Sequence, residues 1–290
     1  MPGHVGRSKG RDLPFRSSAG LTRSLQKGPE QGAARLASSD WILETRGLAK
    51  DFNGFLAVRG VDLRVAEGTI HALIGPNGAG KTTMFNLLTK FVRPSAGQIL
   101  YRGDDITGAA PAAVARRGLV RSFQISAVFP HLTVLENVRV ALQRKLGTHY
   151  RFWESQSSLA VLDARARQLL TEVRLDGAEA LPAAELPYGR KRALELATTL
   201  ALDPVVMLLD EPTAGLAHED IAGIADLVRR VARGRTVLMV EHNLGLVADL
   251  ADRITVLQRG EVLAEGSYQE VSANPAVIEA YMGSAQVGHG

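Results

Sequence analysis

The stretch GPNGAGKTT, residues 75–83, decides the fold of this chain. It matches the pattern G-x-x-x-x-G-K-S/T, and it lies between an apolar run at 69–74 that predicts a strand and a helical pattern that begins near Lys81. Glycines let such a loop curl so that its backbone N–H groups face phosphate oxygens. We therefore predict a phosphate-binding loop in which Lys81 reaches the β- and γ-phosphates and the Thr82 hydroxyl binds Mg²⁺. The expected loop contacts are Gly75, Pro76, Asn77, Gly78, Ala79, Gly80, Lys81, Thr82 and Thr83.

Two further apolar runs end in groups that fit this chemistry. VVMLLDEP, residues 205–212, predicts a buried strand that ends in two carboxylates, and ligands of open α/β folds bind at the carboxyl ends of strands. Asp210 is predicted to hold Mg²⁺, because hard cations prefer carboxylate oxygens. Glu211 is the candidate base that orients and polarises an attacking water. His242 follows the apolar run TVLMVEH and is predicted to contact the γ-phosphate.

The rest of the chain alternates between strand and helix patterns, which predicts an α/β fold with a parallel sheet. We expect a core of the P-loop NTPase (RecA-like) type with antiparallel β additions and a helical lobe at about 126–199, where strand signals are few. LQRGEVLAEG, residues 257–266, predicts a hairpin that turns at Gly260. The other predicted strands are 58–65, 98–101, 236–240, 253–257 and 261–264. The other predicted helices are 159–173, 190–202 and 221–232.

Composition limits the possible functions. The 290 residues contain no cysteine, which excludes a disulfide framework and suits a cytosolic protein. Of the formal net charge of +4, residues 1–40 contribute seven Lys or Arg against three Asp or Glu, which leaves 27 of each sign in residues 41–290. The body is therefore electrically balanced, and the basic chain gives no reason to expect a nucleic-acid partner.

The ends of the chain differ from its body. Residues 1–39 are rich in Gly, Ser, Arg and Pro without apolar periodicity, so we expect a disordered basic tail, although such a tail could also touch anionic lipid. We expect one nucleotide-binding domain at 40–285 and a short tail at 286–290. The longest apolar stretch, around 194–209, is interrupted by Glu195 and Asp203, so no segment is expected to span a bilayer.

Taken together, these motifs resemble the ATP-binding subunits of ABC transporters over residues 41–284. The resemblance implies that the cofactors are ATP and Mg²⁺. It also implies that Gln124, in RSFQ, contacts the nucleotide and metal and links them to a membrane partner. Phe52, in KDFNG, stands where the family stacks an aromatic ring on adenine, although this position is equally compatible with a core residue. AGLA, residues 214–217, ends in Ala217 where the family usually has Asp, which puts in doubt an Asp-mediated contact across a dimer.

LPYGR, residues 186–190, stands at the position of the family's signature, most often Leu-Ser-Gly-Gly-Gln. In the family, this turn binds the γ-phosphate of an ATP that the other subunit holds. Pro187 replaces the signature serine, so the resemblance implies contact through the backbone, chiefly at Gly189. The implied contact residues are Leu186, Tyr188, Gly189 and Arg190.

Three features resemble the branched-chain amino acid importers and their urea or amide relatives: the Tyr-Gly signature, VFPHLTVLENV (128–138) and NPAVIEAYMG (274–283). The last motif is equally compatible with an ordinary amphipathic terminal helix. The resemblance implies an ATP-hydrolysing subunit, peripheral on the cytoplasmic face of the membrane, that pairs with a second ATP-binding subunit in a homo- or heterodimer. It would act on membrane permease subunits and, indirectly, on a solute-binding protein.

Other classes share a phosphate loop. A soluble ABC-type ATPase that acts on ribosomes or DNA generally carries two nucleotide domains or a long coiled-coil insertion, whereas this chain has one phosphate loop and no heptad run. A GTPase would need an Asn-Lys-x-Asp guanine reader, which the sequence lacks. Neither a GTPase nor a small-molecule kinase would use Gln124, the signature turn and His242 together.

Overall fold

The computed structural model describes residues 41–122, 128–146 and 156–286. All of these residues belong to one compact unit, Ser38–Gly290. Gln124 therefore lies outside the described residues. No helix within the described ranges is long and apolar enough to cross a membrane.

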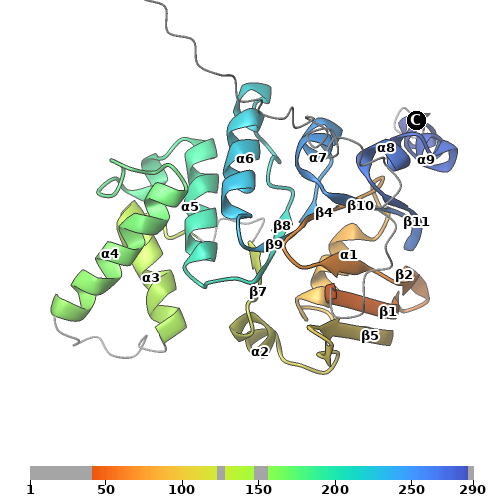
Figure 1. Cartoon of the computed structure of the whole chain (residues 1–290), viewed down its shortest axis with the longest axis horizontal. Coiled ribbons are helices and arrows are strands. Elements are labelled where there is room, and N and C mark those ends of the chain that lie inside the picture. The colour runs from red at the N-terminus through yellow and green to blue at the C-terminus, as the bar shows by residue number, and fades with distance from the viewer. Residues whose placement is uncertain (1–40, 123–127, 147–155, 287–290) are drawn as a thin grey trace, which may run out of the picture. The chain divides into compact units, whose positions relative to one another are not determined.

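The centre of this unit is a six-stranded sheet in the order β11-β10-β4-β9-β8-β7 (Figure 1). Five neighbouring strands run parallel, and β11 pairs antiparallel with β10. This arrangement confirms the predicted P-loop type of α/β core. The strands are β4 (Ile70–Ile74), β7 (Leu119–Ser122), β8 (Val206–Asp210), β9 (Thr236–Val240), β10 (Arg253–Gln258) and β11 (Glu261–Gly266).

The inner strands of this sheet are buried on both faces. Successive side chains of a strand point to opposite faces, and those of β8 divide in this way between two apolar cores. Met207 and Leu209 belong to the core formed with α5, α6 and α7, whereas Val206 and Leu208 belong to the core formed with α1 and the antiparallel strands. Such burial explains why these strands are continuous apolar runs in the sequence.

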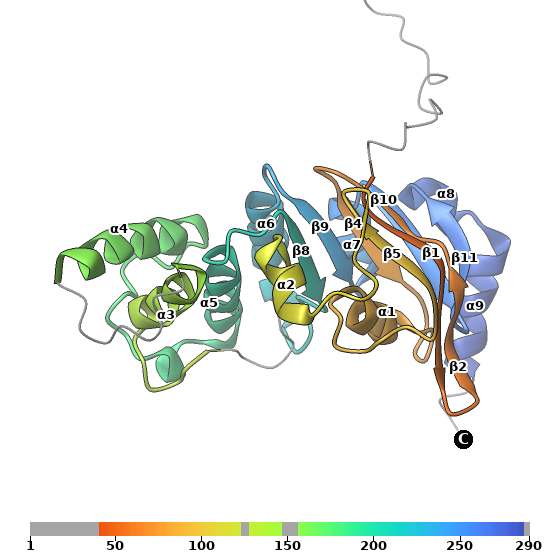
Figure 2. The same cartoon turned by 90° about the horizontal axis from the view of Figure 1, so that it is seen from below.

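A second, antiparallel sheet provides β additions of the expected kind (Figure 2). Its order is β2-β1-β5-β6, and β3 also pairs with β1. The strands are β1 (Trp41–Phe52), β2 (Phe55–Val61), β3 (Arg64–Ala66), β5 (Ala96–Tyr101) and β6 (Asp104–Asp105).

The prediction of one strand over 58–65 is wrong. β2 ends at Val61 and β3 begins at Arg64, because the chain crosses between two parts of β1. At the crossing, the Asp62 carboxylate accepts a hydrogen bond from the Gly47 backbone N–H at 2.6 Å. Local side-chain bonds of this kind replace the ladder of a continuous strand.

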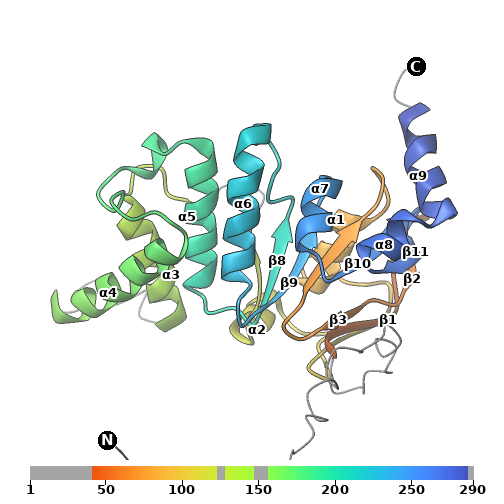
Figure 3. The same ribbon diagram turned by 45° about the horizontal axis from the view of Figure 1, so that its top comes forward.

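The helices divide between the central sheet and a helical lobe (Figures 1 and 3). The lobe contains α3 (Val134–Leu146), α4 (Gln156–Glu172) and α5 (Tyr188–Leu200), with a short 3₁₀ turn at Ala183–Glu185. α5 begins two residues before the predicted start, since Pro187, whose fixed φ suits a helix entry, is its N-cap. The remaining helices are α1 (Lys81–Leu88), α2 (Pro111–Arg116), α6 (His218–Val231), α7 (Leu244–Leu250), α8 (Tyr268–Ser272) and α9 (Pro275–Gln286).

Candidate active site

Three neighbouring strand ends bring the predicted catalytic groups together. β9 lies between β4 and β8 and is parallel to both. The phosphate loop (residues 75–83) leaves the end of β4, His242 follows the end of β9, and Asp210 ends β8. Groups separated by more than a hundred residues in the sequence therefore share one edge of the sheet, which is where open α/β folds bind ligands.

The phosphate loop has a conformation that requires glycine at its end. Gly80, the N-cap of α1, has φ 101°, and a Cβ at this position would lie 2.6 Å from the carbonyl oxygen of Ala57. Asn77, Gly78 and Thr82 are exposed at the surface of the loop, whereas Ala79 is buried. The exposed side of the loop is thus available to a ligand.

Lys81 turns back across this loop. Its Nζ donates hydrogen bonds to the carbonyl oxygens of Gly75 at 2.7 Å and Pro76 at 2.9 Å. Burial lowers the pKa of Lys81, and the nearby carboxylates of Glu211 and Asp210 oppose that shift. The ammonium is therefore held inside the loop by groups that a phosphate could replace.

Asp210 is buried and forms an ion pair with Arg121 of β7. The Nη1 of Arg121 also donates to the Asn86 side-chain oxygen at 2.7 Å. The oxygens of Asp210 and Thr82 are hard donors that fit Mg²⁺. The described residues contain no group of three or more His, Asp or Glu side chains that could hold a metal ion. Mg²⁺ commonly binds one or two protein oxygens and completes its shell with substrate phosphates and water, so the donor set fits this ion.

Glu211 and His242 are direct partners. Nε2 of His242 lies 2.7 Å from Oε1 of Glu211. The backbone of Glu211 has φ 45°, a left-handed conformation that non-glycine residues seldom adopt, and its N–H donates to the Val240 carbonyl at 2.9 Å. Strained backbone of this kind often accompanies functional sites, and here it directs the Glu211 side chain toward His242.

A buried arginine on α5 holds the backbone that carries these carboxylates. Arg192 donates to the carbonyl oxygens of Asp210 at 2.9 Å, Glu211 at 3.0 Å and Pro212 at 3.3 Å. Its charge is balanced by Glu195, one turn further along α5, at 2.6 Å. The helix that begins at the signature turn (residues 186–190) is thereby fixed to the acidic end of β8. Sequence reasoning missed this residue.

A buried carboxylate holds the same segment from the other side. Glu241 accepts hydrogen bonds from the Thr213 N–H at 3.0 Å and from the Thr213 hydroxyl. Its second oxygen accepts from the N–H groups of His242 at 2.7 Å and Asn243 at 3.0 Å. Glu241 therefore ties the histidine loop to the residues after Glu211. The only signal in the sequence is an acidic residue directly after an apolar strand.

The signature turn lies at the start of α5. Leu186 is buried in the core, and Arg190 is half-buried in the first turn of the helix. Tyr188 is exposed, and its hydroxyl donates to the Ala214 carbonyl at 2.9 Å. Gly189 lies inside the first turn rather than before the helix, and a Cβ there would meet only Leu216, at 3.9 Å.

The other two predicted positions lie at the end of β1 and at the start of α6. Phe52 ends β1 with 44% of its surface exposed, so it is not a core residue, and the Nζ of Lys50 lies 4.9 Å from its ring centre. Ala217 is the N-cap of α6 and makes no side-chain cap bond.

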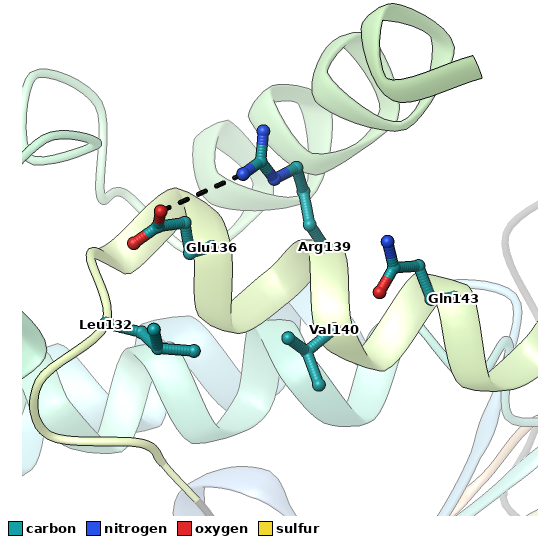
Figure 4. A pocket seen from close by; sticks show the side chains of 5 residues that line it. All are labelled: Leu132, Glu136, Arg139, Val140 and Gln143. Atoms are coloured by element: carbon teal, nitrogen blue, oxygen red, sulfur yellow. Dashed lines mark ion pairs between the residues drawn. The ribbon is translucent and has the colours of Figure 1, made fainter. Parts of the chain in front are cut away.

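A hollow of about 190 Å³ lies on α3, and Glu136 and Arg139 form an ion pair there at 3.9 Å. Figure 4 shows the side chains that line it. The hollow contains none of the predicted nucleotide-binding residues. Its lining residues are Leu132, Glu136, Arg139, Val140 and Gln143.

The fold and this constellation define a P-loop nucleoside triphosphatase. Residues 58–214 match the family model of the ABC transporter, and residues 261–286 match that of the branched-chain amino acid ATP-binding cassette transporter. The chain therefore belongs to the ABC transporter family, as an ATP-binding cassette. Proteins of this class bind and hydrolyse ATP.

Relatives and solved structures support the same assignment. The high-affinity branched-chain amino acid transport ATP-binding protein BraF of Pseudomonas aeruginosa is 39% identical over 251 residues, which cover 84% of this chain and 98% of that protein. Protein LivG of Escherichia coli, described in the same words, is 38% identical over 254 residues with the same coverage. The ADP conformation of an ATP-binding cassette of an ABC transporter superposes with a TM-score of 0.74 at 30% identity, covering 84% of this chain and 99% of that one. A dimeric bacterial ABC transporter cassette gives a TM-score of 0.65 at 25% identity over 78% of this chain and 98% of that one.

Proposed function

We propose that this chain is the ATP-hydrolysing subunit that powers branched-chain amino acid import through a membrane ABC transporter. The observation that carries this proposal is the match of residues 261–286 to the branched-chain family model, because that segment lies outside the general cassette match. The names of BraF and LivG point to the same solute class. The alternative is a subunit of a urea or amide importer, and the test below distinguishes it from a branched-chain amino acid importer.

In the proposed reaction, the phosphate loop and Lys81 bind the phosphates of ATP and the exposed ring of Phe52 stacks on adenine. Mg²⁺ would be held by Thr82, Asp210 and Gln124, and it would neutralise phosphate charge. Glu211 orients the attacking water as general base, and His242 contacts the γ-phosphate while it holds the Glu211 carboxylate in place. The hydrogen bonds that Arg192 donates and Glu241 accepts support this geometry, because they fix the backbone on both sides of Glu211.

The signature turn is proposed to act on the nucleotide of a second ATP-binding subunit, through Leu186, Tyr188, Gly189 and Arg190. Figures 1 and 3 support this, since α6 and the central strands lie between α5 and α1. The first N–H groups of α5 have no partner within the helix, and the positive end of its dipole favours an anion. Gly189→Asp tests this model. A Cβ at this position meets only Leu216 at 3.9 Å, so we expect a folded protein that fails to complete a partner's site.

The proposed partners follow from this arrangement. Two ATP-binding subunits, identical or different, would close on ATP and drive permease subunits at the cytoplasmic face of the membrane, with Gln124 and the helical lobe at 126–199 passing the movement on. A solute-binding protein would deliver the amino acid. We propose residues 40–285 as the nucleotide-binding domain, with tails at 1–39 and 286–290.

The test is a reconstituted transporter. The chain would be co-expressed with candidate permease subunits of a branched-chain amino acid transporter and placed in vesicles with a solute-binding protein that binds leucine. We expect ATP-dependent uptake of radiolabelled leucine, and none with a Lys81→Ala subunit. Uptake of urea or acetamide but not leucine would replace the proposed solute. Failure to assemble with any permease, together with ATPase activity stimulated by ribosomes, would reject the transport function.

A further inference from the structure

Arg121 meets the proposed Mg²⁺ ligand Asp210 on one face of the central sheet. Arg121 lies on β7 and pairs in register with Leu208 of β8, whose side chain belongs to the core formed with α1. Residues paired across neighbouring strands share a face, and Asp210, two residues after Leu208, points to that face as well. Arg121 and Asp210 form an ion pair there, and both side chains are largely buried.

The helix α1 holds Arg121 from the other side. Nη1 of Arg121 donates to the Asn86 side-chain oxygen at 2.7 Å, and its Cζ lies 5.7 Å from the centre of the buried Phe85 ring. Asn86 comes four residues after Thr82, so these two side chains lie one turn apart on the same face of the helix. The guanidinium therefore bridges the helix that carries Thr82 and the strand that carries Asp210.

We propose that Arg121 is a positioning residue that fixes the Asp210 carboxylate relative to Thr82 and thereby sets how strongly Mg²⁺ tightens ATP binding. This inference rests on the proposed nucleotide site and deepens it. The guanidinium is a rigid, planar fork, so its bond to Asn86 also fixes the direction of its bond to Oδ2 of Asp210. The second oxygen of the carboxylate can then face Mg²⁺ or water bound to it.

The charge of Arg121 suits a buried metal ligand. Asp210 is 1% exposed, and a buried carboxylate without a cation strongly destabilises a fold. Arg121 balances that charge when no metal ion is bound. Because Asn86 and Phe85 hold the guanidinium against α1, Arg121 does not depend on Asp210 for its place. The carboxylate can therefore turn one oxygen to Mg²⁺ while the side chain that orients it stays fixed.

The test compares the ATP affinity of each variant in excess Mg²⁺ and in EDTA, measured by calorimetry. Arg121→Lys keeps the positive charge, but an ammonium cannot reproduce the fixed fork of the guanidinium. We expect its ATP affinity in EDTA to stay close to wild type. The gain in affinity that Mg²⁺ gives should be roughly 10-fold smaller, the lower end of the cost of losing a group that orients a metal ligand.

Asn86→Ala removes the anchor and keeps the pair between Arg121 and Asp210. It is the variant that decides the matter if Arg121→Lys does not fold. Its Mg²⁺ gain should be about 2–10-fold smaller than that of the wild type, the scale of one hydrogen bond.

Two controls frame these variants. Arg117→Lys is the matched control, because Arg117 also pairs with an aspartate, Asp104, at 2.5 Å, and its Cζ lies 5.5 Å from the centre of the Tyr101 ring. Neither partner is a proposed nucleotide or metal ligand, so Arg117→Lys should keep the full Mg²⁺ gain. Asp210→Asn removes the charged metal ligand itself and should lose most of the gain.

The ratio of the two affinities separates positioning from structural support. A purely structural Arg121 would lower the melting temperature and weaken both affinities by the same factor, which cancels in the ratio. A reduced ratio in Arg121→Lys, Asn86→Ala and Asp210→Asn, with a normal one in Arg117→Lys, supports the inference. The bridge needs both ends, so a wild-type ratio in either Arg121→Lys or Asn86→Ala, beside a reduced one in Asp210→Asn, overturns it and leaves the metal site intact. An equal reduction in Arg117→Lys also overturns it, and a wild-type ratio in Asp210→Asn rejects the metal site and the inference with it.

Discussion

Nε2 of His242 lies 2.7 Å from Oε1 of Glu211, so the side chains at the ends of β9 and β8 form one hydrogen-bonded pair. The backbone of each residue is also held by a hydrogen bond. The Glu211 N–H donates to Val240 at 2.9 Å, and the His242 N–H donates to Glu241 at 2.7 Å. The base and the γ-phosphate contact are therefore oriented together before a nucleotide arrives, which reduces the reorganisation needed during hydrolysis.

His242→Ala removes one member of this pair. We expect ATP affinity close to wild type and a fall in kcat of roughly 10–100-fold, the scale of one hydrogen bond to a charged group. A phosphate-release assay measures this. His131→Ala, at an exposed position before α3, is the matched control. A normal kcat in His242→Ala would remove His242 from catalysis.

Arg192 should affect stability and catalysis through different partners. Arg192→Met leaves Glu195 buried without its cation, and breaking a buried pair costs about 3–5 kcal/mol. Arg192→Met with Glu195→Leu should recover most of the free energy of unfolding, measured in urea. Its kcat should nevertheless stay at least about 10-fold low, because the carbonyls of Asp210 and Glu211 have lost their charged donor. A double variant with wild-type kcat would show that Arg192 serves stability alone.

Lys90, two residues after the end of α1, is expected to destabilise the fold. It has φ 66° and is buried, and its Nζ has no hydrogen-bond partner among the described residues. Lys90→Gly should raise the free energy of unfolding by about 1 kcal/mol from the backbone alone. Lys90→Ala keeps the strained backbone, so its free energy of unfolding should rise only because the buried ammonium group is removed. A Lys90→Gly variant less stable than wild type would contradict this account.

The effect of Lys90 should also depend on pH. Burial lowers the pKa of Lys90, and the Asp105 carboxylate only partly opposes the shift. A base whose pKa is lowered by folding destabilises the fold while it is protonated. The advantage of Lys90→Ala should therefore be largest near neutral pH and should shrink as the pH rises toward the ordinary value of 10.5.

His71 should make the fold sensitive to acid. Burial lowers its pKa to about 3 from 6.5, with Arg253 adding to the shift, and its Nε2 lies 2.8 Å from Oγ1 of Thr255. Since folding lowers the pKa of His71, the contribution of its neutral imidazole to the free energy of unfolding is fully present above pH 6.5. This contribution is lost as the pH falls toward 3. Between pH 5 and 6, the free energy of unfolding of His71→Gln should therefore fall less steeply with decreasing pH than that of the wild type, by up to about 1.4 kcal/mol per pH unit. An equal pH dependence of the free energy of unfolding in both proteins, measured by urea unfolding, would contradict this prediction.

Much of the core could be predicted because local pattern and tertiary burial agree there. β4, β8 and β9 are apolar runs buried on both faces, and each ends at a motif. β1 was missed, because its twelve residues contain a glycine and several register shifts that hide the alternation. β7 has only four residues, too few to show a period.

The site residues that belong to sequence motifs could be predicted from the sequence. The residues that hold them in place through hydrogen bonds could not. Arg192, Glu241 and Arg121 act on groups 18, 28 and 89 residues away, and most of those groups are backbone atoms. A hydrogen bond to a backbone atom does not depend on the residue type of the partner, so the sequence does not indicate it. Only the three-dimensional path of the chain reveals such contacts.

The most direct test of the account is ATP hydrolysis by Glu211→Gln beside wild type. Glutamine keeps the shape of the side chain but cannot accept a proton from water. We predict an unchanged ATP dissociation constant, a fall in kcat of roughly 10²–10⁴, and a dimer on size-exclusion chromatography that forms only with ATP. Near-normal turnover by this variant, with no ATP-dependent dimer, would contradict the account.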